Sequence, residues 1–222
     1  PSGSVYTQVE TAAIANVLRK HDNVFTISDE IYELINFTTR HASLAAEPGM
    51  IERVITVNGV SKGFAMTGWR LGYIGAPKWI AAACTKIQGQ FTSAPCSISQ
   101  AAAAEAVDQD PSISKSMLEA FLRRRDVMHA DLSKVPGIKL NLPMGAFYLF
   151  PDISELFGLS YEGRTLNNSD DVAMFLIEEA HVATVSGAAF GTPECIRISY
   201  AAADEVLAEA VRRIDTAVRK LS

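Results

Sequence analysis

Three short apolar runs, each followed at once by a polar or glycine-rich turn, constrain the fold of this chain most strongly. They cover residues 24–28, 53–57 and 71–76. The runs read as continuously buried, which is typical of the strands of a parallel sheet that is covered on both faces. In such sheets ligands bind just beyond the carboxyl ends of the strands. The sequence therefore predicts an α/β fold whose functional residues lie in the turns after these runs.

The rest of the chain has an organisation that predicts two domains. Apolar residues at helical spacing between Glu10 and Lys20 predict one amphipathic helix. Further helices are expected at 77–90, 95–107, 111–134, 170–180 and 203–221, with Ser169 or Asp170 as a cap. Strands are expected at 138–142, 146–150, 182–185 and 195–200. We expect a mostly parallel sheet domain over residues 1–122 and a small α+β domain over residues 123–222.

Charge and hydropathy exclude several classes of partner. The 222 residues are 48% hydrophobic and carry a formal net charge of −5. That charge gives no electrostatic reason to expect nucleic acid. No apolar run reaches the roughly 18 residues of a membrane span, so we expect no membrane partner. We therefore expect a protein of the cytoplasm.

Cysteine and histidine usage bears on redox compartment and metal binding. The three cysteines are odd in number and lack CxxC spacing, which predicts reduced, mostly buried thiols. The four histidines show no metal-ligand spacing, and we expect no metal.

Lys62 lies just past the second predicted strand, and Arg70 follows it in the same glycine-rich segment. A lysine amine can condense with an aldehyde to give a Schiff base, and a guanidinium can hold a phosphate through two parallel hydrogen bonds. Pyridoxal 5′-phosphate presents both groups. Such a spacing also recurs by chance between surface residues, so this pair needs support from elsewhere in the chain.

That support is a second half-site at the end of the first predicted strand. Asp29 follows the strand directly, and Tyr32 comes three residues later. A carboxylate there can accept the N1 proton of the pyridine ring and keep the ring cationic, so that it withdraws electrons from the substrate α-carbon. The tyrosine can donate a hydrogen bond to the ring oxygen beside the aldehyde. Taken alone, Asp29 would more often be a helix cap or turn residue.

Together these segments resemble the class I/II aminotransferases of the fold-type I pyridoxal-phosphate superfamily, and among them the bacterial-type aspartate aminotransferase subgroup. The resemblance runs nearly end to end through residues 1–3, 28–32, 57–73, 145–151 and 196–200. It implies a homodimer in which Lys62 forms the Schiff base and Arg197 binds the substrate α-carboxylate. It also implies that Asp29 meets the pyridine nitrogen, Tyr32 the ring oxygen and Arg70 the phosphate.

The resemblance also bears on what precedes Pro1. Residues 1–3 resemble the tail of an Asn-Pro-(Ser/Thr)-Gly element whose asparagine reaches the ring oxygen. The family's glycine-rich phosphate loop and ring-stacking aromatic are not found in the chain. We therefore expect the chain to be the C-terminal part of a longer enzyme.

The phosphate and partner-subunit contacts depart from the family pattern. Gly59 stands where many relatives have a phosphate-binding serine, so Ser61 is an open candidate for that role. Gly89 stands where animal and enteric aspartate aminotransferases have the arginine for a distal carboxylate. Thr92 and Ser93 either reach the phosphate of a partner subunit or cap the helix that follows.

The expected activity is ping-pong transamination between an amino acid, with aspartate or glutamate favoured, and a 2-oxo acid. Alternatives left open are a lyase and an aminotransferase for aromatic amino acids, prephenate or alanine. An aminotransferase-like cofactor-binding domain of a regulator is also open. Phe147 and Tyr148 either line the substrate side or belong to the core.

Overall fold

The computed structural model describes residues 1–38 and 40–222 and divides the chain into two units. Val5–Leu118 forms one unit, which we call the sheet unit. Pro1–Ser4 and Glu119–Ser222 form the other, which we call the C-terminal unit. The predicted domains at 1–122 and 123–222 stay a prediction, because two units of dense contacts need not fold independently.

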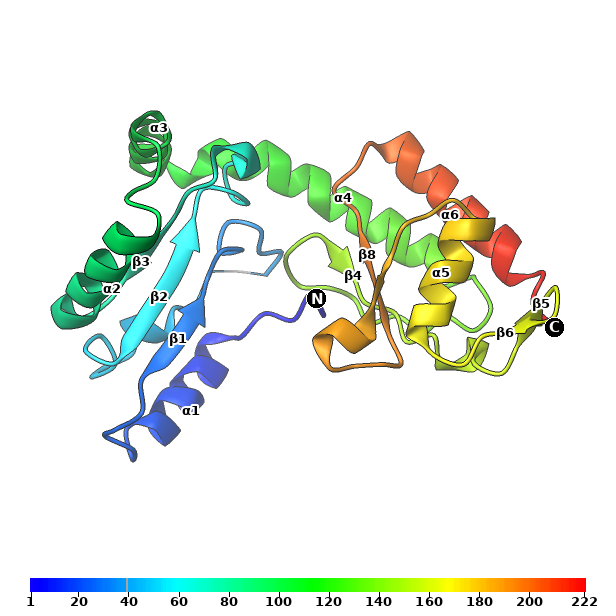
Figure 1. Ribbon diagram of the computed structural model, residues 1–222, viewed down its shortest axis with the longest axis horizontal. Coiled ribbons are helices and arrows are strands. Elements are labelled where there is room, and N and C mark those ends of the chain that lie inside the picture. Colours follow the sequence, from blue (N-terminus) through cyan, green and yellow to red (C-terminus); the bar gives the residue numbers. More distant parts are fainter. Residues whose placement is uncertain (39) are drawn as a thin grey trace. The chain divides into compact units, whose positions relative to one another are not determined.

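The sheet unit is built on three strands, β1 (Thr26–Asp29), β2 (Val54–Gly59) and β3 (Gly72–Gly75), with β2 in the middle (Figure 1). β1 runs parallel to β2, but β3 runs antiparallel to it and is exposed along its whole length. The expectation of three continuously buried parallel strands is therefore wrong for β3, and continuous burial is wrong for β1 as well, whose residues alternate between half-buried and exposed. The chain between β2 and β3 forms only tight turns and a 3-10 helix, η2 (Thr67–Trp69), whereas a parallel connection needs a crossover, usually a helix.

The predicted helices of the sheet unit are present, with small shifts in their ends. They are α1 (Gln8–Leu18), α2 (Lys78–Phe91) and α3 (Ser97–Asp108). Thr7 and Glu10 form a capping box at the start of α1, which satisfies two backbone donors reciprocally. Ala15 from α1 packs with Leu44, Met50 and Val54 in a buried cluster beside the 3-10 helix η1 (Leu44–Ala46).

The long helix predicted at 111–134 is divided in the structure. A 3-10 turn, η3 (Pro111–Ser114), precedes α4 (Lys115–Leu132). The Asp110 carboxylate accepts the Ser112 N–H at 2.8 Å, which fixes this turn before the α-helix begins.

The C-terminal unit contains a small antiparallel sheet in the order β4–β8–β7. Its strands are β4 (Tyr148–Leu149), β8 (Ile196–Ser199) and β7 (Val185–Ser186). Helices α5 (Ser169–Glu179) and α6 (Asp204–Val218), with two 3-10 helices, η4 (Ser154–Leu156) and η5 (Gly187–Phe190), complete the unit. A hairpin that was not predicted, β5 (Ser160–Tyr161) with β6 (Arg164–Thr165), adds a second small sheet.

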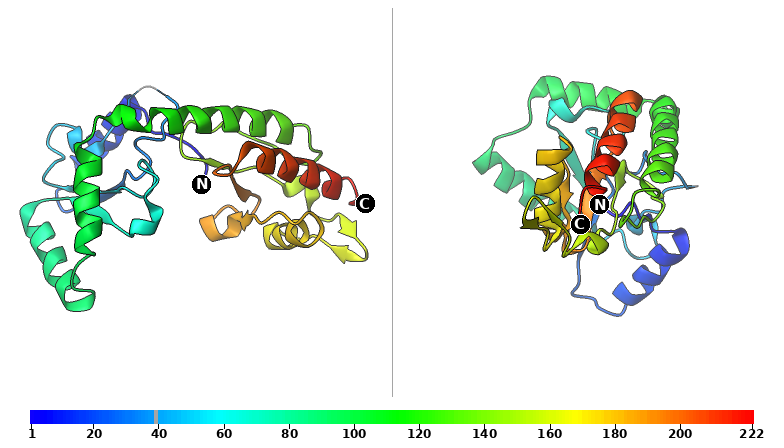
Figure 2. Two further views of the ribbon diagram at one scale, coloured as in Figure 1. Left: turned by 90° about the horizontal axis from the view of Figure 1, so that it is seen from above. Right: turned by 90° about the vertical axis from the view of Figure 1, so that its right-hand side faces the viewer.

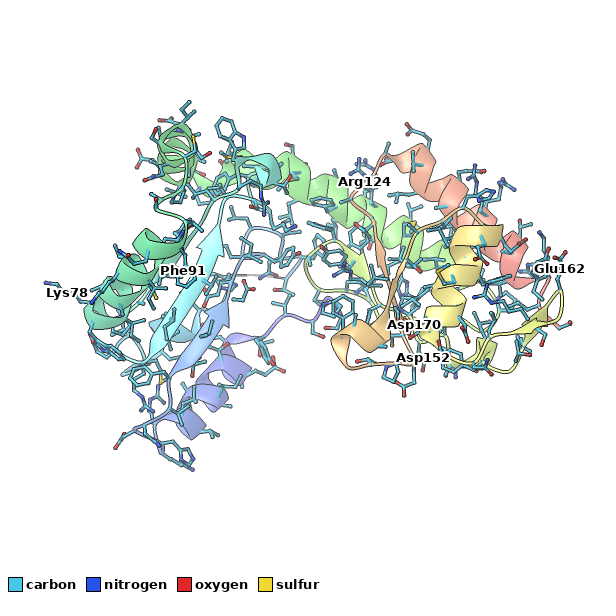
Figure 3. The ribbon with its side chains drawn as sticks, in the orientation of Figure 1. Lys78, Phe91, Arg124, Asp152, Glu162 and Asp170 are labelled. Atoms are coloured by element: carbon cyan, nitrogen blue, oxygen red, sulfur yellow. The ribbon has the colours of Figure 1, made fainter. Side chains whose placement is uncertain are left out.

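Helix α6 runs alongside the part of α4 that belongs to this unit (Figure 2). Arg124, labelled in Figure 3, extends from α4 and its Nε lies 2.6 Å from the Asp204 carboxylate at the start of α6. Arg123 binds the same carboxylate at 2.8 Å. The two arginines therefore tie the first turn of α6 to α4.

Two local predictions in the C-terminal unit are wrong. Residues 138–142 form only a single bridge, between Lys139 and Asp152, because the neighbouring polar groups bond to the first residues of the chain. The Asn141 amide donates to the Ser2 carbonyl at 3.1 Å, and the Met144 N–H donates to the Gly3 carbonyl at 2.7 Å.

The second wrong prediction concerns the residue that caps the start of α5. Its cap is Asn168, whose side-chain oxygen accepts the Asp171 N–H at 3.0 Å, instead of Ser169 or Asp170. Ser169 is instead buried and shares a hydrogen bond with Ser186 at 2.8 Å.

The burial of the cysteines differs from the expectation. Cys84 and Cys96 are exposed and only Cys195 is buried, so the expectation of mostly buried thiols is wrong. Cys84 is exposed because it lies on α2, a helix that has no buried residue. Among the described residues, no helix is both long and apolar enough to cross a lipid bilayer.

Candidate cofactor and substrate site

The topology of the sheet unit brings three predicted site segments to one edge of the sheet. Asp29 ends β1 and lies opposite Val57 of the parallel strand β2. Lys62 follows the end of β2 at the same edge. Because β3 is antiparallel and Gly72 pairs with Gly59, Arg70 enters β3 from that edge as well. Backbone pairing alone therefore gathers an acid, an amine and a guanidinium.

The turn after β1 presents Asp29 and Tyr32. The Glu30 N–H donates to the Val57 carbonyl at 2.8 Å, which extends the pairing with β2 one residue past Asp29. The Asp29 carboxylate is exposed and accepts the Ile31 N–H at 3.3 Å. Tyr32 is half-buried in the turn. Asp29 thus keeps most of its acceptor capacity for a ligand, since a carboxylate has about four lone-pair sites.

Glu30, next to Asp29, anchors this turn, although no local sequence pattern indicates such a role. Its carboxylate is buried and accepts hydrogen bonds from Ser28 at 2.9 Å and from Ser43 at 2.9 Å, and lies 2.8 Å from His41 Nε2. Burial acts to raise the pKa of Glu30, but these three hydrogen bonds together lower it. The Glu30 carboxylate is therefore held in its charged form and joins the end of β1 to residues 41–43.

Glu33 provides a second tie, between the same turn and β2. Its carboxylate accepts a hydrogen bond from the buried Asn58 side chain at 2.7 Å, and Asn58 accepts the Gly59 N–H at 2.7 Å. Burial raises the pKa of Tyr73, and the charge of Glu33 raises it further. The turns that carry Asp29 and Lys62 are thus joined through side chains as well as through the sheet.

His41 is expected to titrate above its usual pKa of 6.5, because its hydrogen bond to Glu30 raises the pKa more than burial lowers it. A raised pKa means that protonated His41 stabilises the fold fully below pH 6.5, and that this contribution is lost as the pH rises through the raised value. An NMR titration of the imidazole ring checks the direction of the His41 pKa shift. Glu30→Gln is expected to bring the pKa back toward 6.5, whereas an unchanged pKa in that variant would contradict the pairing.

Ligand atoms of Glu30, Glu33 and His41 lie within 4.8 Å of one another, a spacing that a metal ion could bridge. The hydrogen bonds just described already use these atoms. We therefore interpret the cluster as a structural network, and the expectation of no metal stays a prediction.

The Lys62 segment is a tightly packed turn. The Ala65 N–H donates to the Lys62 carbonyl at 3.2 Å, and the Ser114 hydroxyl donates to the Gly63 carbonyl at 2.5 Å. A Cβ added at Gly63 would lie 2.9 Å from the Leu34 side chain, so the close approach favours glycine there. The Lys62 side chain is half-buried.

The segment also contains strained backbone. Ala65 has φ 54° and Arg70 has φ 51°, in the left-handed region that residues other than glycine seldom occupy. Arg70 is exposed, and its guanidinium donates to the Thr67 carbonyl at 2.8 Å. Strain of this kind is often found at ligand sites, where the surrounding structure imposes it.

The positions around the predicted phosphate site explain one departure from the family. A Cβ at Gly59 would lie 3.0 Å from both the Gly72 Cα and the Leu71 carbonyl oxygen. The close pairing of β2 with β3 therefore leaves little room for a serine at this position. Ser61 is half-buried in the turn before Lys62, and its predicted role stays a prediction.

Thr92 and Ser93 follow α2 and do not cap the next helix. Thr92 is the C-cap of α2, and the residue that precedes α3 as its N-cap is Cys96. Ser93 has φ 64°, again in the left-handed region. Gly89 has no atom within 4 Å of an added Cβ, so packing does not explain why an arginine is missing there.

Arg197 lies on β8 of the C-terminal unit, opposite Val185 of β7. It is half-buried between the buried residues Ile196 and Ile198 of the same strand. Its guanidinium contacts the rings of Tyr148 and Phe190. From sequence alone the role of Tyr148 stays open, and the signal for Phe190 is only that it is an aromatic residue in the glycine-rich segment before β8.

Comparisons with known proteins agree with this arrangement. The family model for aminotransferase class I and II matches residues 1–214. A bifunctional aspartate aminotransferase and glutamate/aspartate-prephenate aminotransferase of Petunia hybrida is 46% identical over 98% of this chain and 47% of its own length. An aspartate/prephenate aminotransferase of Cereibacter sphaeroides is 44% identical over 100% of this chain and 56% of its own length.

A solved structure of an aminotransferase is also similar to this chain. The crystal structure of the aspartate aminotransferase from Rhizobium meliloti matches with a TM-score of 0.94 and 40% identity, over 100% of this chain and 56% of that protein. The chain thus spans about half the length of the relatives that it matches. The similarity covers both units, including β2 with the Lys62 turn and β8 with Arg197. The chain belongs to the class I and II aminotransferase family, whose fold is that of the fold-type I enzymes.

Proposed function

We propose that the whole protein containing this chain is a pyridoxal-phosphate-dependent aminotransferase that moves an amino group between an amino acid and a 2-oxo acid. The observation that carries the proposal is the convergence of Asp29, Lys62 and Arg70 at one edge of the three-stranded sheet. Membership of the aminotransferase family supports it, because that family depends on pyridoxal phosphate.

The chemistry of the residues present fits this cofactor. A half-buried amine suits an aldehyde, an exposed carboxylate suits a protonated ring nitrogen, and a guanidinium suits a phosphate. When bound, pyridoxal phosphate supplies an electron-withdrawing ring that stabilises negative charge on the α-carbon of an amino acid. Lys62 would hold the aldehyde carbon, Asp29 the ring nitrogen, Tyr32 the ring oxygen, and Arg70 with Ser61 the phosphate.

Lys62 and Arg197 have further roles toward the substrate. Toward the substrate, the Lys62 amine would act as the base that takes the α-carbon proton and as the acid that returns a proton. Arg197 binds the α-carboxylate of the amino acid through paired hydrogen bonds. Fixing the carboxylate orients the bond to the α-proton, which favours transamination over decarboxylation.

For the substrate we propose aspartate or glutamate as amino donor. Relatives named as aspartate aminotransferases support this choice. Prephenate is a second candidate as amino acceptor, because other relatives are named as aspartate/prephenate aminotransferases. We also propose a homodimer with shared active sites, to which Thr92 and Ser93 contribute, working in the cytoplasm.

The test is an amino-transfer assay of the whole protein with pyridoxal phosphate. Aspartate with 2-oxoglutarate is expected to give oxaloacetate and glutamate, and a panel of aromatic amino acids, alanine and prephenate ranks the alternatives. A protein that binds the cofactor but transfers no amino group from any donor would instead favour the regulator. Formation of ammonia without amino acid product would favour a lyase.

A further inference from the structure

Two aromatic rings contact the Arg197 guanidinium. Its central carbon Cζ lies 4.5 Å from the centroid of the Tyr148 ring and 4.7 Å from that of Phe190. Both distances are inside the roughly 6 Å over which a cation is attracted to an aromatic face. In the described part of the chain, the guanidinium has no hydrogen-bond or ion-pair partner. The rings are therefore the contacts that hold its orientation.

The two rings reach Arg197 from different elements. Tyr148 lies on β4, where it pairs with Ser199 of β8, two residues beyond Arg197. Phe190 ends the 3-10 helix η5, which follows β7. Phe190 also makes an edge-to-face contact with Phe150, at 6.0 Å between centroids. The guanidinium is thus contacted by two rings that come from separate elements.

The backbone around Phe190 is tightly fixed. The Gly187 N–H donates to the Cys195 carbonyl at 2.7 Å, and the Thr192 N–H donates to the Gly187 carbonyl at 3.0 Å. A Cβ added at Gly187 would lie 2.2 Å from the Thr192 carbonyl oxygen, so only glycine fits this close approach. Gly191 then turns the chain with φ 75°, a conformation that glycine adopts readily. Phe190 is consequently held on a short, constrained segment.

Aromatic contacts suit an arginine that must bind an anion. A ring attracts the guanidinium through its π face and consumes none of the five N–H donors of the arginine. The donors along the edge of the guanidinium remain available for two parallel hydrogen bonds to a carboxylate. A carboxylate partner from the protein would orient the arginine as well, but it would compete with the substrate. The rings orient the side chain without that competition.

We propose that Tyr148 and Phe190 are positioning residues that hold the Arg197 guanidinium ready for the substrate α-carboxylate. The inference rests on the proposed function, because it assigns Arg197 to that carboxylate. Each ring lowers the freedom of the unbound arginine, so the loss of either ring weakens carboxylate binding. The cofactor, which is held by residues of the sheet unit, is bound as before.

The experiment uses the whole protein loaded with pyridoxal phosphate, with succinate as the probe and cofactor absorbance as the readout. Phe190→Leu and Tyr148→Leu are each expected to weaken succinate binding about tenfold, within the range that one cation–π contact supplies. Phe190→Tyr and Tyr148→Phe keep a ring and are expected to bind within about twofold of the unaltered protein. With aspartate, the leucine variants are expected to change KM more than kcat.

Tyr161→Leu is the matched control. Tyr161 lies in the same unit and its ring packs on Phe175 at 5.6 Å, away from Arg197. Its replacement is expected to leave succinate binding unchanged. Leucine variants at positions 148 and 190 that bind succinate as tightly as the unaltered protein would overturn the inference. Ring-retaining variants that are as impaired as the leucine variants would also overturn it, because shape alone would then explain the loss.

A second measurement is independent of folding defects. Mono-, di- and trifluorophenylalanine at position 190 keep the shape of the ring while they weaken its negative face stepwise. The affinity for succinate is expected to fall with each added fluorine. A constant affinity across the series would refute a cation–π role. Failure of the proposed function looks different, since the unaltered protein would then form no amino acid product from a 2-oxo acid with any donor.

Discussion

Replacing Lys62 by alanine in the whole protein is expected to lower the rate of amino-group transfer by at least about 10³-fold, because in the proposed function one side chain both holds the cofactor and moves the α-proton. A positioned acid or base alone contributes about 10²- to 10⁴-fold. Lys62 is half-buried in a turn fixed by the bond from Ser114 to the Gly63 carbonyl. Among the described lysines of the sheet unit, Lys62 alone follows the carboxyl end of one of the two parallel strands, β1 and β2. A steady-state assay with aspartate and 2-oxoglutarate measures the loss.

Lys78→Ala is the control for the loss of a lysine. Lys78 is exposed at the start of α2 and lies outside the proposed site (Figure 3). Its replacement is expected to leave the rate unchanged. Added methylamine is expected to restore part of the activity of Lys62→Ala, since a free amine can act as the missing base. If Lys62→Ala transfers amino groups at the rate of the unaltered protein, the assignment of Lys62 is wrong.

Asp29→Ala is expected to give the second largest loss, about 10²-fold in the rate of amino-group transfer. A hydrogen bond to a charged group contributes up to about 3 kcal/mol, which corresponds to that factor. In the proposed site the Asp29 carboxylate would keep the ring nitrogen protonated, so its removal would make the ring a weaker electron sink. The loss is expected mainly in kcat, because the other contacts to the cofactor remain. Stopped-flow absorbance of the half-reaction with aspartate measures it.

Asp29→Asn separates charge from shape, because the amide has the same size but cannot stabilise a cationic ring to the same degree. It is expected to be almost as slow as Asp29→Ala. Asp22→Ala is the control, since the Asp22 side chain is fully exposed in the same unit and lies before β1. Full activity in Asp29→Asn would show that the charge at position 29 is not used.

The predictable part of the site depends on local sequence. Asp29 and Lys62 could be found because each follows a short apolar strand, and the end of a strand is where ligands bind in such sheets. Their convergence needed only the parallel pairing of β1 with β2. The helices could be located because their apolar spacing and the prolines and caps at their ends are also local signals.

The parts that the sequence analysis missed depend on pairing between distant segments. β3 runs antiparallel to β2 because of the way residues 60–71 turn. No hydrophobic pattern in the sequence specifies that turn. The buried carboxylate of Glu30 finds His41 and Ser43 more than ten residues away. Phe190 contacts Arg197 only because β7, β8 and the segment between them fold onto each other. Side-chain networks of this kind are visible only once the backbone is in place.

The central claim is that the amine of Lys62 carries the cofactor. Its most direct test is borohydride reduction of the whole protein with bound pyridoxal phosphate, followed by digestion and mass spectrometry of the peptides. The account predicts one modified lysine, in the peptide that contains Ser61, Lys62 and Gly63. A protein that transfers amino groups but carries the reduced adduct on a different lysine would contradict it.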